Sequence, residues 1–341
     1  MTKIHILFKI YDKPTGGGNQ FLRSLKNFLQ TIDAYEENVE KADAVLFNSH
    51  QYVEIVSKLK QKYPYKLFVH RIDGPIRLYN NLDDKRDLIV NTFNKMISDA
   101  TIFQSEWSKK QNHNMGLEQN NFETVIQNAP DPLIFNKEKK EPFSSKRRIR
   151  LIATSWSSNI KKGFHIYEWL DNNLDFEQYD MTFVGNSPIS FKRINHINSL
   201  TSKNLSELLK KNDIFITASQ KDPCSNSLIE AMHCGLPALA LKDGGHIKLV
   251  GTGGELFEKV SEIPYCLEKI VKYYSEYQRN ISLPGMDTIG RLYYTFIESL
   301  LLEIHNKRYQ PKELSRKNYY KLKYLLIKIK LIEILKIKLS I

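Results

Sequence analysis

The chain has 341 residues, of which 41% are hydrophobic and 26% charged, with a formal net charge of +12. This length predicts two domains, and the composition excludes disordered and fibrous proteins. The three cysteines form no even framework and no Cys-x-x-Cys pair, which is typical of a reduced, cytoplasmic chain. Lys9 and Asp12 interrupt the first apolar run too early for a secretory signal. No stretch reaches the roughly 18 apolar residues of a membrane-spanning helix.

Short apolar runs rich in β-branched residues alternate with segments of helical periodicity. In the first half of the chain, these runs predict strands at residues 4–10, 44–47, 67–69, 101–103 and 125–126. One helical face between the first two strands is spaced as Phe21, Leu22, Leu25, Phe28 and Leu29. Alternation of strands and helices indicates a parallel sheet covered by helices on both faces.

The same alternation returns after a charged, proline- and serine-containing break at residues 137–147. Later runs predict strands at residues 149–153, 181–184, 214–217 and 237–241, and Leu205, Leu208 and Leu209 predict a helix. We therefore expect an α/β protein of two doubly wound, Rossmann-like domains that face each other across a cleft. Its parts are a first domain at residues 1–136, a linker at 137–147, a second domain at 148–285, a helix at 286–305 and a basic tail at 306–341.

The stretch of residues 214–257 carries the strongest functional pattern. A strand leads into a polar loop, a helix, a second strand and a glycine pair. Asp222 lies on the loop and Glu230 lies early in the helix, so both carboxylates are able to face one site. Backbone N–H groups at the helix start, from Ser225, Asn226 and Ser227, favour a phosphate. A carboxylate beside a phosphate suits the hydroxyls of a ribose or sugar.

A structural alternative exists for Glu230. The run Ser227-Leu228-Ile229-Glu230 is also a capping box, in which Glu230 would do no more than close its own helix.

The run Glu230-Ala231-Met232-His233-Cys234-Gly235-Leu236-Pro237, followed by Gly244-Gly245, resembles the donor-binding signature of family 4 glycosyltransferases of the GT-B fold, the glycosyl transferases group 1. The resemblance implies that Glu230 holds the donor ribose. It also implies that Asp222, one methylene shorter than the usual glutamate, lies near the transferred sugar as a catalytic residue. Lys248 and the pair Cys224-Ser225 depart from the family pattern.

A second match follows the strand at 149–153. The family places Arg and Lys-Gly in this loop to neutralise the donor diphosphate, and here Lys162 directly precedes Gly163. A cation at that position would stabilise the charge that develops on a leaving diphosphate. The usual Arg is missing, so the resemblance implies that Lys161 compensates.

The resemblance also assigns residues of the first domain. The glycine-rich run Lys13-Pro14-Thr15-Gly16-Gly17-Gly18 lets the backbone approach a ligand closely, and Gly17 and Gly18 would face the donor phosphates. A tight turn is the alternative. His70, Arg71 and Asp73 would lie on the acceptor side, where Asp73 or His70 would contact the acceptor hydroxyl, unless they are ordinary loop residues.

No metal or cofactor is expected. The chain has no Asp-x-Asp motif, and no two of its nine histidines lie within five residues of each other. We therefore expect metal-independent transfer, with a nucleotide-diphosphate sugar as substrate and not as a bound cofactor.

Basic charge gathers at the C-terminal end. Residues 306–341 carry eleven Lys and Arg but two Glu, a net +9, so the preceding 305 residues carry only +3. The lysines of residues 319–341 scatter around a helical wheel without one clean apolar face. The segment is either a solvated, loosely ordered extension or an attachment to an anionic membrane.

Together these observations predict a cytoplasmic glycosyltransferase, peripheral on the inner face of the membrane if the tail binds there. The resemblance implies retention of anomeric configuration, a glycan or lipid-linked acceptor, and a role in surface polysaccharide or lipopolysaccharide synthesis. It also implies that the helix at 286–305 packs back on the first domain. The alternatives are a GT-B nucleotide-sugar epimerase and a basic nucleic-acid-binding protein. Because charge is concentrated in the tail and no RNA-binding motif is visible, we expect no nucleic-acid partner.

Overall fold

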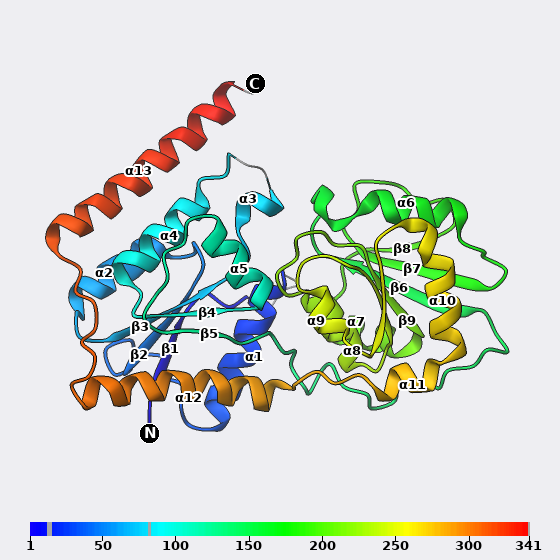
Figure 1. Ribbon diagram of the computed structural model, residues 1–341, viewed down its shortest axis with the longest axis horizontal. Helices are drawn as coiled ribbons and strands as arrows, with labels where there is room; N and C mark the ends of the chain where they lie inside the picture. The colour runs from blue at the N-terminus through cyan, green and yellow to red at the C-terminus, as the bar shows by residue number, and fades with distance from the viewer. Residues whose placement is uncertain (12–15, 81–82, 340–341) are drawn as a thin grey trace. The chain divides into compact units, whose positions relative to one another are not determined.

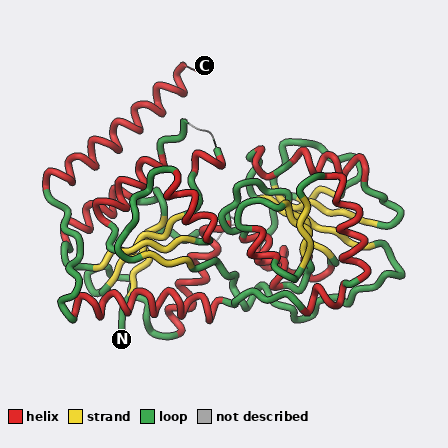
Figure 2. The backbone as a smooth tube through the Cα atoms, in the orientation of Figure 1, coloured by secondary structure: helices red, strands yellow, loops and turns green. Residues whose placement is uncertain are grey.

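The computed structural model describes residues 1–11, 16–80 and 83–339, and these form two compact units (Figure 1). The first unit takes Met1–Lys9, Lys26–Gln127 and the chain from Gly290 onward. The second takes Ile10–Leu25 and Asn128–Ile289. Each unit has its own parallel sheet, drawn in yellow in Figure 2. The expected α/β class with two parallel sheets is confirmed.

The sheet of the first unit has five parallel strands in the order β1-β2-β3-β4-β5. They are β1 (Ile4–Leu7), β2 (Ala44–Asn48), β3 (Leu67–Ile72), β4 (Ala100–Phe103) and β5 (Glu123–Val125). All five strands predicted in this half of the chain are present, with shifted ends. A parallel bridge between Ile4 and Tyr35 lies outside the named strands. The chain therefore visits the free edge of β1 after its first helix and then returns to β2 on the other side.

Helices cover both faces of this sheet (Figure 1). They are α2 (Val53–Lys62), α3 (Ile76–Tyr79), α4 (Arg86–Ile97), α5 (Glu106–Asn114) and α13 (Arg316–Leu339), with the parts of α1 (Gly17–Thr31) and α12 (Met286–His305) that follow Leu25 and Ile289. Val56 of α2 and Phe93 of α4 belong to one buried cluster with strand residues. The later part of α1 lies against α12, where a Cβ on Gly290 would collide with the ring of Phe28.

The sheet of the second unit has six parallel strands in the order β11-β10-β9-β6-β7-β8. They are β6 (Ile149–Ser155), β7 (Tyr179–Gly185), β8 (Asn195–Ile197), β9 (Ile214–Thr217), β10 (Ala238–Leu241) and β11 (Gly254–Phe257). The short strands β8 and β11 were not predicted, because neither contains a continuous apolar run. Counted within the unit, the order is the 3-2-1-4-5-6 of Rossmann folds, with its reversal between β6 and β9.

Side chains of the central strands alternate between two cores, as the pleat of a strand requires. Ile214 and Ile216 point into one buried cluster, and Phe215 points into the other. The covering helices are α6 (Phe164–Asn173), α7 (Ser202–Lys211), α8 (Asn226–His233), α9 (His246–Val250), α10 (Ile263–Lys272) and α11 (Tyr274–Arg279), with short 3₁₀ turns η1 (Ile160–Lys162) and η2 (Val260–Glu262).

The charged segment 137–147 is bound to the second unit by an ion pair. Arg147 forms a two-pronged ion pair with the buried Asp213, with N–O distances of 2.6 and 2.9 Å. Upstream of it, Phe135 packs in the core of the second unit. Residues 128–136, which the break in composition assigns to the first domain, therefore lie in the second compact unit.

The described part of the C-terminal segment packs in the first unit, so the alternative of a loosely ordered extension is wrong. Helix α13 packs on α2 and α4 through Leu322 and Ile329, which are buried in the same cluster as Val56 and Phe93. In agreement with the absence of one clean apolar face, α13 has apolar side chains on two opposite sides. No helix of the described chain is long and apolar enough to cross a membrane.

Candidate functional site

The predicted donor residues meet at the reversal of strand order in the second unit. The loop after β6 carries Lys162, and the loop after β9 carries Asp222. These two strands are neighbours in the sheet, and parallel strands present their carboxyl ends at one edge. Ligands of doubly wound sheets bind at this edge, beside the reversal.

Lys162 is positioned by the glycine that follows it. Gly163 has a φ of +78°, and a Cβ there would lie 2.2 Å from the carbonyl oxygen of Ala218. Only glycine allows η1 to approach the end of β9 this closely. As a result, the Lys162 ammonium lies 3.1 Å from Asp222 Oδ2 and 3.1 Å from Ser219 Oγ.

Asp222 is a buried carboxylate in an ion pair with Lys162. Its Oδ1 accepts from the backbone N–H of Cys224 at 3.2 Å, and its Oδ2 accepts from Ser219 Oγ at 3.3 Å. Burial alone would raise the pKa of Asp222. The Lys162 ammonium and the hydrogen bonds from Lys162 and the Cys224 N–H outweigh burial and hold the pKa below its usual value. Asp222 is therefore ionised at neutral pH.

The glycine pair after β10 packs directly on the Asp222 loop. A Cβ on Gly244 would lie 2.3 Å from the carbonyl oxygen of Asp222, and one on Gly245 would lie 2.3 Å from that of Pro223. The Gly245 N–H also donates to the Asp222 carbonyl at 2.8 Å. The pair thus fixes the backbone that carries the acidic side chain.

His246, which follows this pair, was not predicted. It is fully buried, and its Nδ1 lies 2.9 Å from the carbonyl oxygen of Leu241. Its Nε2 has no hydrogen-bond partner among the described residues. Burial lowers the pKa of His246 despite the nearby Asp222, so the ring is neutral at pH 7. Its position directly after Gly244-Gly245 was the one signal in the sequence.

Glu230 does not close a capping box. The helix begins two residues earlier than that alternative requires, with Ser225 as N-cap and Glu230 in the helix interior. Its carboxyl group is buried and has no hydrogen-bond or ion-pair partner among the described residues. Burial raises the pKa of Glu230 to about 8. A buried carboxyl without a partner is costly, and such groups mark functional sites.

The first turn of α8 meets the glycine-rich segment inside the second unit. A Cβ on Gly17 would lie 2.2 Å from the Asn226 side-chain nitrogen, whereas nothing lies within 4 Å of one on Gly18. Asn226 Oδ1 accepts from Asn128 Nδ2 at 3.0 Å. Ser225 is buried, and its Oγ lies 3.2 Å from Ser227 Oγ. Lys13, Pro14 and Thr15 lie outside the described residues.

The predicted acceptor-side residues occupy the end of β3 in the first unit. His70 is fully buried and stacks on Phe47; its Nε2 lies 2.8 Å from the Ser49 carbonyl oxygen and its Nδ1 lies 3.3 Å from Asn94 Nδ2. His70 therefore exposes no ring atom to an acceptor. Burial lowers its pKa to about 3.

Arg71 is also fully buried, and its guanidinium group forms an ion pair with Asp73. Its Nη1 lies 3.1 Å from Asp73 Oδ1, and Gln104 donates to the same oxygen. The Asp73 side chain is about one-third exposed, at 36%. Of the three acceptor-side residues, only Asp73 presents its side chain to solvent.

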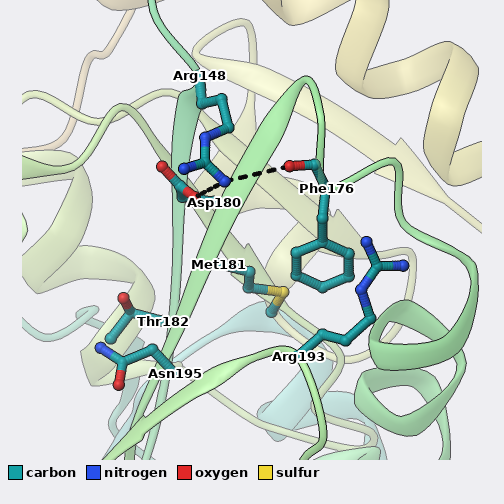
Figure 3. Close-up of a pocket in the computed structure, with 7 residues that line it drawn as sticks. All are labelled: Arg148, Phe176, Asp180, Met181, Thr182, Arg193 and Asn195. Carbon is teal, nitrogen blue, oxygen red and sulfur yellow. Dashed lines mark hydrogen bonds and ion pairs between the residues drawn. The ribbon is translucent and has the colours of Figure 1, made fainter.

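A separate pocket lies at the opposite end of the second sheet (Figure 3). It has a volume of about 510 Å³ and lies beside the first residues of β7 and β8. Arg148 is paired with Asp180 at 2.9 Å, and Arg193 covers the ring of Phe176. None of its lining residues was predicted to bind the donor. Among the described residues, no group of three or more His, Cys, Asp or Glu is arranged to hold a metal ion.

Comparisons with known proteins agree with this arrangement. Residues 191–275 match the family model of the glycosyl transferases group 1, a range that contains Asp222 and Glu230. No curated protein sequence matches the chain.

Several solved structures share the fold. HepE of Anabaena, crystallised with UDP and glucose, is 14% identical, covers 90% of this chain and 100% of its own, and has a TM-score of 0.63. Sucrose-phosphate synthase of Thermosynechococcus elongatus is 12% identical, covers 97% of this chain and 100% of its own, and has a TM-score of 0.62. AviGT4, a glycosyltransferase involved in avilamycin A biosynthesis, is 11% identical, covers 89% and 98%, and has a TM-score of 0.59.

The two parallel sheets and this structural likeness define the GT-B fold, as the sequence predicted. The expected enzyme class is confirmed as well. Residues 191–275 match the glycosyl transferases group 1 model, which identifies a glycosyltransferase domain in this chain.

Proposed function

We propose that the protein transfers a sugar from a nucleotide-diphosphate sugar, held by the second unit, to an acceptor hydroxyl. The observation that carries this proposal is the ion pair of Lys162 and Asp222 at the reversal of a Rossmann sheet, on the loops that precede α6 and α8. Glu230 lies within α8, and its buried carboxyl has no partner among the described residues. In support, the structurally similar HepE has been crystallised with UDP and glucose and also with UDP-glucose.

Each residue has a distinct role in this proposal. Glu230 accepts hydrogen bonds from the ribose hydroxyls, and Asp222 accepts them from the transferred sugar. The diphosphate binds at the N–H groups of Asn226 and Ser227, which a helix leaves unsatisfied. During transfer, the bond from the anomeric carbon to the diphosphate oxygen breaks, the acceptor oxygen bonds to that carbon, and the acceptor hydroxyl proton passes to the leaving diphosphate. Lys162 stabilises the charge that the leaving diphosphate gains.

A panel of UDP, GDP, ADP and CMP tests the donor site by thermal shift. A nucleotide at ~100 Kd adds about 2.7 kcal/mol of stability. The Glu230→Ala variant should bind that nucleotide more weakly by roughly 1.5–3 kcal/mol, the worth of charged hydrogen bonds. No stabilisation by any nucleotide, or unchanged affinity in Glu230→Ala, would contradict the proposed site.

We further propose that transfer needs no metal, because Lys162 supplies the positive charge. Exhaustive EDTA treatment should leave the rate unchanged. Lys162→Ala should lower kcat by a factor on the order of 10²–10³, as for the loss of one preorganised charge-stabilising group. Lys161→Ala is the matched comparison, and a smaller loss there would assign the charge to Lys162. Activity that EDTA abolishes and Mg²⁺ or Mn²⁺ restores would refute metal independence.

For the acceptor, we propose a glycan or a lipid-linked sugar, with retention of anomeric configuration, in surface polysaccharide or lipopolysaccharide synthesis. Such an acceptor would place the enzyme in the cytoplasm, at the inner face of the membrane, which agrees with the +9 charge of residues 306–341. NMR of the product reads the anomeric configuration directly. Incubation of the donor sugar without acceptor separates transfer from epimerisation, since only an epimerase converts the donor alone.

A further inference from the structure

Helix α13 exposes a continuous apolar stripe. Six large side chains, each between 42% and 67% exposed, recur at steps of three or four residues. They form what we call the outer stripe: Tyr320, Tyr324, Ile327, Leu331, Ile334 and Leu335. At about 100° per residue all six fall on one side of the helix, along roughly 22 Å of its length. Contiguous apolar surface of this kind marks an interaction site.

The opposite side of α13 is fixed to the first unit. Leu322 and Ile329 are buried against α2 and α4, and they point about 180° away from the outer stripe. Upstream of the helix, the Asp99 carboxylate accepts from Tyr309 OH at 3.0 Å and from the Lys312 N–H at 2.6 Å. The outer stripe is therefore presented on a rigid support, along the helix drawn in red in Figure 1.

Lysines border the outer stripe on both sides. Lys321 and Lys328 lie seven residues apart along one border, and Lys323 and Lys330 lie along the other. All four are exposed, and none forms an ion pair with a described residue. An apolar face between two rows of lysines is the pattern of a helix that lies in a membrane interface, with its cations at the headgroups.

We propose that the outer stripe docks flat onto an anionic lipid bilayer, with the four lysines against the headgroups. The positive charge of the lysines on both borders favours an anionic bilayer over a second copy of the chain. Two copies of α13 facing each other would bring lysine against lysine beside the apolar seam, which disfavours a coiled-coil pair. An anionic surface instead receives all four ammonium groups.

This docking deepens the proposed function, because it rests on a lipid-linked acceptor for its purpose but on no residue of the donor site. The whole first unit would be held at the bilayer, where such an acceptor is embedded. Removing residues 306–341 is a poor test, since it would uncover Asp99 and the apolar surface of α2 and α4. Single exposed positions are better targets.

The test is flotation of the full chain with vesicles of phosphatidylcholine alone or with phosphatidylglycerol. The wild-type chain should bind the anionic vesicles at low salt and more weakly at high salt. Ile327→Glu with Leu331→Glu should lower the partition coefficient at least tenfold. Leu302→Glu on α12 is the matched control, because Leu302 and Leu331 are both 54% exposed. Lys328→Gln with Lys330→Gln should cost about fivefold for each lysine removed.

Nucleotide binding is measured on every variant, so that failure of docking and failure of the donor site are read separately. Unchanged nucleotide binding and unchanged thermal midpoint show that the variant folds. Docking is overturned if the wild-type chain ignores anionic vesicles, or if the stripe variant binds as well as Leu302→Glu. A wild-type dimer that the stripe substitutions dissociate, with no vesicle binding, would assign the outer stripe to a second copy instead.

Discussion

At the scale of single residues, Glu230 combines a cost in stability with its proposed role in binding the donor ribose. Its carboxyl is buried without a partner among the described residues, and burial raises its pKa to about 8. The proton that it holds at neutral pH must leave when a ribose takes the carboxylate as acceptor. Nucleotide affinity should therefore strengthen as the pH rises toward 8.

The same pKa predicts a pH dependence of folding. Because the folded-state pKa lies above that of the unfolded chain, the protonated group contributes stability that is complete below about pH 4.3 and is lost as the pH rises to about 8. Over that window the free energy of unfolding should fall by up to about 1.4 kcal/mol per pH unit. Urea unfolding at several pH values measures this slope.

Glu230→Gln should remove the slope and should be more stable than the wild-type chain at pH 8. The exposed Glu207 on α7 provides the control, since Glu207→Gln should keep the wild-type slope. Equal slopes in the wild-type and Glu230→Gln chains would show that Glu230 does not titrate in this range.

Gly163 makes a prediction about the backbone that carries Lys162. In Gly163→Ala the new Cβ meets the Ala218 carbonyl at 2.2 Å, in addition to a strained φ of +78°. We expect a loss of about 1–3 kcal/mol and a displaced lysine. Gly116→Ala is the comparison, because its φ is +94° but its nearest neighbour lies 3.9 Å away. If kcat falls in Gly163→Ala but not in a Gly116→Ala variant that is destabilised to a similar extent, Gly163 is linked to the site.

At the scale of elements, one buried carboxylate connects the segment before α13 to the sheet. Asp99 Oδ2 accepts from Lys60 Nζ at 3.1 Å and from the Phe68 N–H at 2.8 Å, while its Oδ1 accepts from Tyr309 and Lys312. Lys60 and Asp99 are both fully buried. The ordering of the segment before α13 therefore depends on a charge pair inside the first unit.

Asp99→Ala should lower the free energy of unfolding by about 3–5 kcal/mol, because it leaves a buried lysine uncompensated. Glu118→Gln breaks the exposed ion pair with Lys95 and should cost at most about 1 kcal/mol. Urea unfolding compares the two variants, and similar costs would contradict the assigned role of Asp99.

At the scale of the whole molecule, donor and acceptor functions are expected to separate between the two units. The proposed donor residues Lys162, Asp222 and Glu230 belong to the second unit, and Asp73 belongs to the first. Asp73→Asn should lower kcat/KM for the acceptor by roughly 10–100-fold, the worth of a charged hydrogen bond. It should leave nucleotide affinity unchanged, because the Asp73 carboxylate is held by Arg71 and Gln104 of its own unit. Steady-state kinetics and the nucleotide thermal shift provide the two readouts, and weakened nucleotide binding would argue against this separation.

The strands of both sheets could be predicted because their apolar, β-branched runs are local features of the sequence. Every predicted strand is present, whereas β8 and β11 were missed because they are short and mixed in polarity. The group 1 signature was equally local, since Glu230 and the glycine pair occupy fixed places along one stretch of chain.

The contacts that make these residues a site could not be read from the sequence. Lys162 and Asp222 lie 60 positions apart, and their ion pair exists because β6 and β9 become neighbours at the reversal of strand order. For the same reason, the sequence left open whether Glu230 was a cap, until the start of α8 at Asn226 decided it. Burial of His70 was likewise decided by the packing around β3.

The positive charge of the C-terminal segment and its mixture of Lys with Leu and Ile follow from its residues alone. Its two apolar faces point in opposite directions. On a helical wheel their hydrophobicities therefore cancel, and no single apolar face can be recognised from the sequence. Only packing on α2 and α4 separates them, because it buries Leu322 and Ile329 and leaves the outer stripe in water. Composition determined that α13 is both apolar and basic, and tertiary structure decided which apolar face remains available to a partner.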